Sequence, residues 1–122
     1  MQTVQSYRDL VVWQKAMTFA KEVIELADQN TSGRKLYRLL EQIQSSSSSV
    51  PMNIAEGLGR KGTKEFIQFL YIARGSLYET ITLLELFKDL NWTREMEYNS
   101  INKKGEEIGR MLMGLIKRLS EK

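Results

Sequence analysis

The sequence predicts an all-α protein folded as an antiparallel, up-down-up-down four-helix bundle. Apolar residues recur at three- and four-residue steps along most of the 122 residues, which is the period of an amphipathic helix. The chain contains a single proline and no run of alternating apolar and polar residues typical of a strand. Short turns separate the periodic stretches, so we expect consecutive helices to be antiparallel neighbours within one domain, residues 1–122.

The first helix is predicted to run from an N-cap at Asp9 to about Asn30. Its apolar residues fill about 200° of the helical wheel, whereas a helix that lines one core needs a stripe somewhat wider than ~100°. This helix therefore has more apolar surface than a single bundle requires.

The second helix contains a proline directly after a run of five serines, residues 45–49. Its apolar stripe continues through Pro51, which favours one helix kinked at the proline, with serine hydroxyls satisfying the carbonyls that the kink frees. The alternative is that the serine run forms a flexible linker between two shorter helices.

A glycine-rich stretch at residues 57–62 ends the second helix, and Thr63 or its neighbour is expected to cap a third. Apolar residues surround this third helix, which runs to about Asn91, almost completely, as in a helix that is buried on every side. A turn at residues 91–93 leads to the fourth helix. The surplus apolar surface of the first and third helices predicts a homo-oligomer with closed symmetry. The alternative is a monomer whose irregular packing and long polar side chains cover the excess.

The composition argues against most classes of enzyme, because the chain has no cysteine and no histidine. Disulfides, zinc fingers, iron–sulfur sites and Cys or His nucleophiles are thereby excluded. The glycine-rich stretch lacks the Lys-Ser/Thr pair of a phosphate-binding loop. We therefore expect no enzymatic activity and no cofactor. The first thirty residues show no signal peptide, and no apolar run approaches the roughly 18 residues of a membrane span, so we expect a cytoplasmic protein without a membrane partner.

Polar residues on apolar helix faces form the sharpest local signal. Arg74 falls between Ile67 and Ile81 on the wheel of the third helix, so it needs a partner, for which Glu56 and Glu79 are candidates. The predicted network comprises Asn53, Glu56, Arg74, Ser76 and Glu79. It is interpreted either as a structural network that fixes helix register or, alternatively, as a ligand pocket.

The net charge of +3 is unevenly distributed along the chain. Residues 31–64 carry +4 and residues 93–122 carry +2, while the two remaining segments are acidic. These basic segments form the second and fourth helices, which run parallel in an up-down bundle. Their cations are either a solvated face or contacts to nucleic acid, whose binding would depend on salt. The candidate contacts are Arg34, Lys35, Arg38, Arg60, Lys61, Lys64, Lys103, Arg110, Lys117 and Arg118. Aromatic and basic residues do not interleave in a way that suggests base-specific readout.

Several motifs resemble one known family. They are Tyr7-x-x-Leu10-x-x-Trp13, the block Val50-Pro51-Met52-Asn53-Ile54-Ala55-Glu56-Gly57, and Ala73-Arg74-Gly75-Ser76 with Glu79. Together they resemble the four-helix-bundle proteins encoded in intervening sequences of bacterial 23S rRNA genes, a family that includes accessory proteins of diversity-generating retroelements.

This resemblance implies a non-enzymatic bundle that assembles as a ring, typically a pentamer, with a basic surface that contacts RNA or DNA. It also implies a protein partner, a reverse transcriptase, in the retroelement branch. Family members often carry two arginines at the positions of Gln44 and Ser45, so contacts through that part of the second helix are in doubt here. We therefore expect association with nucleic acid, RNA being favoured, and keep a protein-interaction scaffold or accessory subunit as the alternative.

Overall fold

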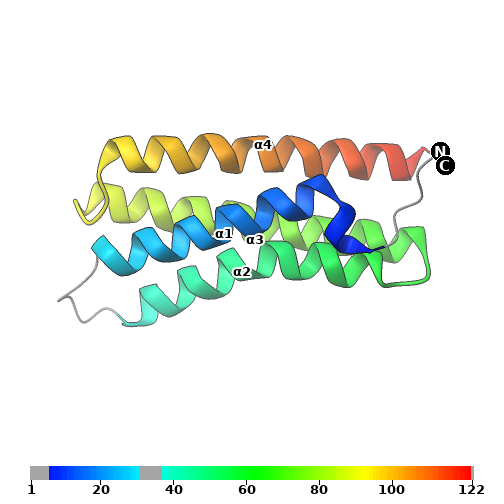
Figure 1. Cartoon of the computed structure of the whole chain (residues 1–122), viewed down its shortest axis with the longest axis horizontal. Helices are drawn as coiled ribbons and strands as arrows, with labels where there is room; N and C mark the ends of the chain where they lie inside the picture. Colours follow the sequence, from blue (N-terminus) through cyan, green and yellow to red (C-terminus); the bar gives the residue numbers. More distant parts are fainter. Residues whose placement is uncertain (1–5, 31–36, 122) are drawn as a thin grey trace.

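The computed structural model describes residues 6–30 and 37–121, so Arg34 and Lys35, two of the predicted nucleic-acid contacts, lie outside the described residues. Its elements are the 3-10 turn η1 (Tyr7–Asp9) and the helices α1 (Val11–Asn30), α2 (Tyr37–Leu58), α3 (Thr63–Asp89) and α4 (Glu95–Ser120). The described ranges contain no strand. The helices run alternately up and down, and each packs beside its sequence neighbour, with α4 returning to α1 (Figure 1). The predicted four-helix bundle is confirmed.

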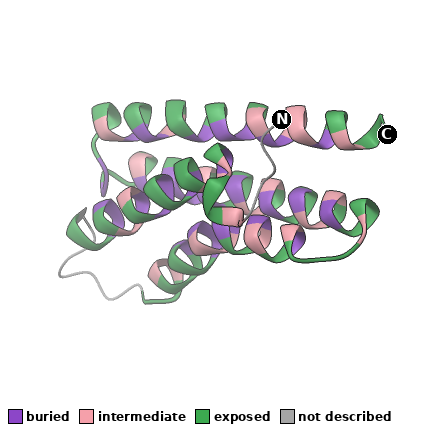
Figure 2. Ribbon diagram, turned by 45° about the vertical axis from the view of Figure 1, so that its right-hand side comes forward, coloured by how far each residue is buried: buried purple, intermediate pink, exposed green. Residues whose placement is uncertain are grey.

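The core lies along the axis between the four helices. Figure 2 shows that each helix turns its buried stripe toward the other helices and its exposed residues outward. The largest fully buried side chains come from all four helices and include Phe19, Ile43, Leu77, Phe87 and Leu112. Apolar burial along this axis is the main force that holds the helices together.

The predicted N-cap at Asp9 is wrong. Ser6 caps η1 instead: its Oγ accepts from the Arg8 amide at 3.0 Å, and its own amide donates to Asp9 Oδ2 at 3.1 Å. This reciprocal pair is a capping box, which needs a hydroxyl and an acid three residues apart. Asp9 therefore closes the turn that precedes α1, and α1 begins two residues later at Val11.

The helix α2 is continuous from Tyr37 to Leu58 with Pro51 inside it, so the alternative of a serine linker is wrong. Serine hydroxyls donate back to the helix: Ser47 Oγ to the Ile43 carbonyl at 2.7 Å and Ser48 Oγ to the Gln44 carbonyl at 2.8 Å. These carbonyls lie a turn upstream of the Ser47 carbonyl, the one that Pro51 leaves without an amide donor. A kink at Pro51 stays a prediction.

The helix α3 begins at Thr63, with Gly62 as its N-cap, and ends before Asn91, whose φ of 65° lies in the left-handed region that helix C-termini use. A single chain does not bury α3 on every side. One flank exposes Tyr71 and Tyr78, and a second exposes Ile72 and Leu86. The chain by itself therefore leaves apolar surface on α3 open to solvent.

Candidate nucleic-acid interface

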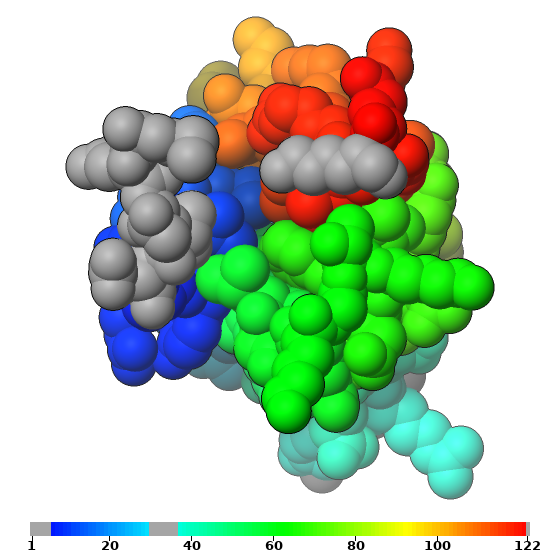
Figure 3. Space-filling model, turned by 90° about the vertical axis from the view of Figure 1, so that its right-hand side faces the viewer, coloured from blue at the N-terminus to red at the C-terminus, as the bar shows by residue number. Residues whose placement is uncertain are grey.

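The α2–α3 turn and the last turns of α4 lie at the same end of the bundle (Figure 1). Figure 3 views this end directly, with the α2–α3 segment and the end of α4 side by side. Five predicted contacts gather here, and all are exposed: Arg60, Lys61, Lys64, Lys117 and Arg118. We call these five residues the basic end. They come together because α2 and α4 run parallel, which places both of their C-termini on one side.

Carboxylates neutralise only part of the basic end. Arg60 Nη2 lies 2.9 Å from Glu56 Oε2, one helical turn earlier, and its guanidinium lies 5.1 Å from the centre of the Phe69 ring. Glu65 and Glu121 are the further acids in these turns. Four cations therefore face two carboxylates once the Arg60 pair is set aside. The remaining positive potential is exposed, so it attracts anions in a salt-dependent way.

The remaining predicted contacts do not join the basic end. Lys103 and Arg110 are exposed earlier in α4, away from its C-terminal end. Arg38 lies in the first turn of α2, at the opposite end of the bundle. Arg110 and Arg118 line a hollow of about 640 Å³ between α4 and the start of α1, together with Asp9 and Glu107. The structure thus divides the eight candidates that it describes between two ends and one side of the bundle.

The predicted network around Arg74 does not form. Glu56 pairs with Arg60, which lies four residues later, just past the end of α2, and Glu79 Oε2 accepts from Gln42 Nε2 at 3.4 Å. Arg74 instead lies over the Tyr78 ring, 4.8 Å from its centre, and its buried Nε has no hydrogen-bond partner. The expectation of a carboxylate partner for Arg74 is therefore wrong, because each candidate acid points to a nearer polar group.

A different polar network joins α2 to α3. Ser49 Oγ lies 2.9 Å from Ser76 Oγ and accepts from Asn53 Nδ2 at 2.8 Å. Thr80 Oγ1 lies 2.8 Å from both Ser46 Oγ and the Ser76 carbonyl. Asn53 and Ser76 belong to the network predicted from the sequence, whereas Ser46, Ser49 and Thr80 do not. Their signal was spacing: Ser46, Ser49 and Asn53 share one face of α2. Because the hydroxyls satisfy one another, the network fixes the register of α2 against α3.

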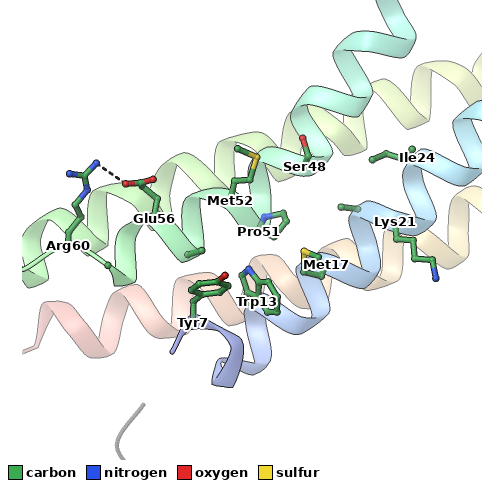
Figure 4. A pocket seen from close by; sticks show the side chains of 13 residues that line it. Tyr7, Trp13, Met17, Lys21, Ile24, Ser48, Pro51, Met52, Glu56 and Arg60 are labelled. Atoms are coloured by element: carbon green, nitrogen blue, oxygen red, sulfur yellow. Dashed lines mark ion pairs between the residues drawn. The ribbon is translucent and has the colours of Figure 1, made fainter. Parts of the chain in front are cut away.

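An open apolar groove of about 800 Å³ lies between α1 and α2. Figure 4 shows Trp13 and Met17 on one wall, Pro51 and Met52 on the other, and Tyr7 at one end. Tyr7 and Trp13 meet edge to face with ring centres 5.0 Å apart. We call this feature the α1–α2 groove. It lies on a different surface from the exposed flanks of α3, since α1 and α3 occupy diagonal corners of the bundle.

Residues 6–30 and 37–121 contain no cluster of three or more acidic, His or Cys side chains that could hold a metal ion. None of the helices in this described part of the chain combines the length and apolarity needed to cross a bilayer.

Comparison with known proteins decides the family. A family model described as 23S rRNA-intervening sequence protein matches residues 8–114. The chain belongs to this family. The fold is also similar to a crystal structure at 1.70 Å of a protein with unknown function from the S23 ribosomal protein family of Bacteroides thetaiotaomicron. The two are 31% identical with a TM-score of 0.82, over 88% of this chain and 99% of the other. A comparison with curated proteins found no match.

Membership of the 23S rRNA-intervening sequence family names no enzymatic activity and no ligand. The relation to retroelement accessory proteins stays a prediction. Gln44 and Ser45, which stand where the resemblance implies arginines, are both exposed on α2. They add no charge to that surface. Among the predicted contacts that lie in the described part of the chain, the largest group is the basic end.

Proposed function

We propose that this member of the 23S rRNA-intervening sequence family is a non-enzymatic helical bundle that associates with RNA through the basic end. The supporting observation is the convergence of Lys61 from the α2–α3 turn and Lys64 from the first turn of α3 with Lys117 and Arg118 from α4. Exposed ammonium and guanidinium groups at this density suit a phosphate backbone, to which lysine and arginine supply most of the affinity.

The test compares two double variants that remove the same charge from different places. Lys61→Gln with Lys117→Gln neutralises the basic end. Lys15→Gln with Lys104→Gln removes two lysines whose Nζ atoms pair with Glu107 at 3.2 Å and Glu22 at 2.7 Å. If each lysine of the basic end makes one phosphate contact, the first variant loses roughly 25-fold in affinity for RNA at about 0.1 M salt. The slope of the logarithm of its affinity against the logarithm of salt concentration becomes shallower by about 1.4.

The control variant is expected to keep the wild-type dependence of RNA affinity on salt concentration, because carboxylates already neutralise its two lysines. Titration of mixed RNA by fluorescence anisotropy over a series of salt concentrations measures both quantities. Equal losses in the two variants would mean that net charge alone matters. Wild-type binding that is absent, or that salt leaves unchanged, would overturn the proposal.

A second proposal concerns assembly. The α1–α2 groove is apolar, and Met52 on its wall is 65% exposed, while Ile72 and Leu86 are exposed on α3 at the far corner. Two different apolar surfaces on one chain favour a head-to-tail contact between copies, which closes into a ring when the rotation permits. We propose a homo-oligomer, with the pentamer that the resemblance implies as its expected form. Assembly would also bring several basic ends together on one particle.

Light scattering after nuclease treatment measures the assembly. The expected mass is a multiple of the 14.2 kDa chain. Met52→Glu places a charge in the α1–α2 groove and is expected to shift the mass toward that of the monomer, because burying an unpaired carboxylate is costly. Met96→Glu is the matched control, since Met96 is 81% exposed in the first turn of α4. A wild-type protein with the mass of one chain would contradict the proposal.

A further inference from the structure

One stripe of α3 combines cations with exposed aromatic rings. Lys64, Tyr71 and Tyr78 are spaced seven residues apart, so they lie on one face of the helix. Tyr71 is 49% exposed and Tyr78 is 46% exposed. Gly75 lies between them, and a Cβ built there would meet nothing within 4 Å. The two rings therefore lie on either side of Gly75, where no side chain projects from the helix.

Arg74 packs against one of the two rings in this stripe. Its guanidinium lies 4.8 Å from the centre of the Tyr78 ring, a cation–π contact that limits the ring's freedom. Its Nε is buried and has no hydrogen-bond partner. An arginine held against a ring, with neither of its predicted carboxylates beside it, keeps its charge available to an anion that approaches the ring.

The helix α4 adds a further cation beside the stripe. A Cβ built at Gly105 would lie 2.8 Å from Ile81 Cδ1, and one built at Gly109 would lie 3.8 Å from the Tyr78 hydroxyl. These two contacts give the register of the antiparallel helices: an advance of four residues along α4 corresponds to about four residues back along α3. Two further turns along α4, the exposed Lys117 is level with Tyr71, the middle residue of the stripe.

Two carboxylates of α3 near the rings are directed elsewhere. Glu79 accepts from Gln42 of α2 at 3.4 Å. Glu85, the next position of the seven-residue series, accepts from the Tyr98 hydroxyl at 2.9 Å. The stretch of stripe from Lys64 to Tyr78 therefore presents positive charge and aromatic faces together.

We propose that this stripe binds single-stranded RNA by stacking bases on Tyr71 and Tyr78, with phosphates on Lys64, Arg74 and Lys117. The inference rests on the proposed RNA association and specifies the form of RNA. The residues that carry the rings are about 10.5 Å apart along the helix axis. A single base sandwiched between two rings would need them about 7 Å apart, twice the 3.4 Å stacking distance, so each ring takes a base of its own. Bases inside a duplex already stack on their neighbours, which leaves only unpaired strands with free faces.

The experiment is fluorescence anisotropy with a labelled oligoadenylate about 12 nucleotides long, alone and annealed to its complement. The variant Tyr71→Leu with Tyr78→Leu is expected to lose at least about 10-fold in affinity for the single strand. The variant Tyr71→Phe with Tyr78→Phe keeps the aromatic faces, so its affinity is expected to stay close to that of the wild type. Tyr37→Leu is the matched control, because Tyr37 is 64% exposed at the other end of the bundle.

The possible failures are distinguishable. RNA binding that survives the leucine substitutions, or that favours the duplex, overturns the stacking inference and leaves the basic end as the contact. A wild-type protein that binds neither form overturns both proposals. If the leucine variant instead changes the mass of the assembly in light scattering, the stripe is an interface between copies of the chain and the stacking inference is wrong. A loss of affinity in Tyr37→Leu equal to that in the paired variant would also overturn it.

Discussion

Raising the pH from 10 to 12 is expected to remove roughly 2 kcal/mol of folding stability through one side chain, Tyr98. Burial of the phenol raises the pKa of Tyr98 from its ordinary value of 10.0 to about 12. The hydroxyl also donates to Glu85 Oε1 at 2.9 Å, and the negative charges of Glu85, Asp89 and Glu106 oppose a phenolate. The folded state therefore holds this proton over a range in which the unfolded chain has lost it.

The direction of the effect follows from the two pKa values. Below pH 10 the phenol is protonated in both states, so its contribution to stability is fully present. Above pH 10 the unfolded chain ionises while the folded chain does not, and the free energy of unfolding falls until the pH reaches the folded pKa of about 12. Urea denaturation followed by circular dichroism at a series of alkaline pH values measures this loss.

Tyr98→Phe provides the control. The variant is expected to be less stable than the wild type near neutral pH by about 1.5–3 kcal/mol, because a hydrogen bond to a carboxylate is lost. The part of the alkaline loss that comes from Tyr98 should then disappear, and the stability curves of the two proteins should converge toward pH 12. Parallel curves would show that Tyr98 does not cause the loss.

The periodicity of apolar residues was sufficient to predict the four helices. In each helix these residues recur at three- and four-residue steps and are buried in one shared core. The alternative of a linker at residues 45–49 arose from propensity alone, since serine favours turns and caps. In the structure the apolar neighbours Ile43, Val50 and Ile54 are fully buried. Packing of this stripe outweighs the local preference of the serines, as tertiary contacts commonly do.

The candidate site was less predictable. Segment charges located the basic helices, and the parallel run of α2 and α4 then explained why Lys61 and Lys117 share one end. The partner of Arg74 was not predictable from the helical wheel. A wheel gives the direction of a side chain, but it does not show which of several neighbouring groups that side chain will bind. Glu56 has an arginine four residues later, just past the end of α2, and pairing with it costs less conformational ordering than reaching across to Arg74. Tyr78, four residues after Arg74 on the same helix, was the contact that helical spacing already offered.

Replacing Gly57 by valine is expected to destabilise the protein by about 3 kcal/mol. Gly57 is buried near the end of α2, and a Cβ built on it would lie 2.7 Å from Phe69 Cβ and 2.9 Å from Phe66 Cδ1. Phe69 Cβ is attached directly to the backbone of α3, so no rotamer change can move it away. The larger side chain can be accepted only if the end of α2 moves away from α3.

Gly114→Val is the matched control, because a Cβ at Gly114 would meet only Arg118 Nη1 at 3.8 Å, the far end of a flexible side chain. Its effect on the free energy of unfolding is expected to stay within about 0.5 kcal/mol. Urea denaturation of both variants tests the difference, and equal stabilities would show that α2 and α3 are not held together at Gly57.

This close approach also explains why the block Asn53-Ile54-Ala55-Glu56-Gly57 ends in glycine directly before the basic end. Gly57 lets the last turn of α2 rest on the first turns of α3, which positions the turn that bears Lys61 and Lys64. A valine that separates the two helices should therefore weaken RNA binding as well as folding, even though Gly57 carries no charge. RNA binding that keeps its wild-type affinity in a folded Gly57→Val protein would show that the basic end does not depend on this packing.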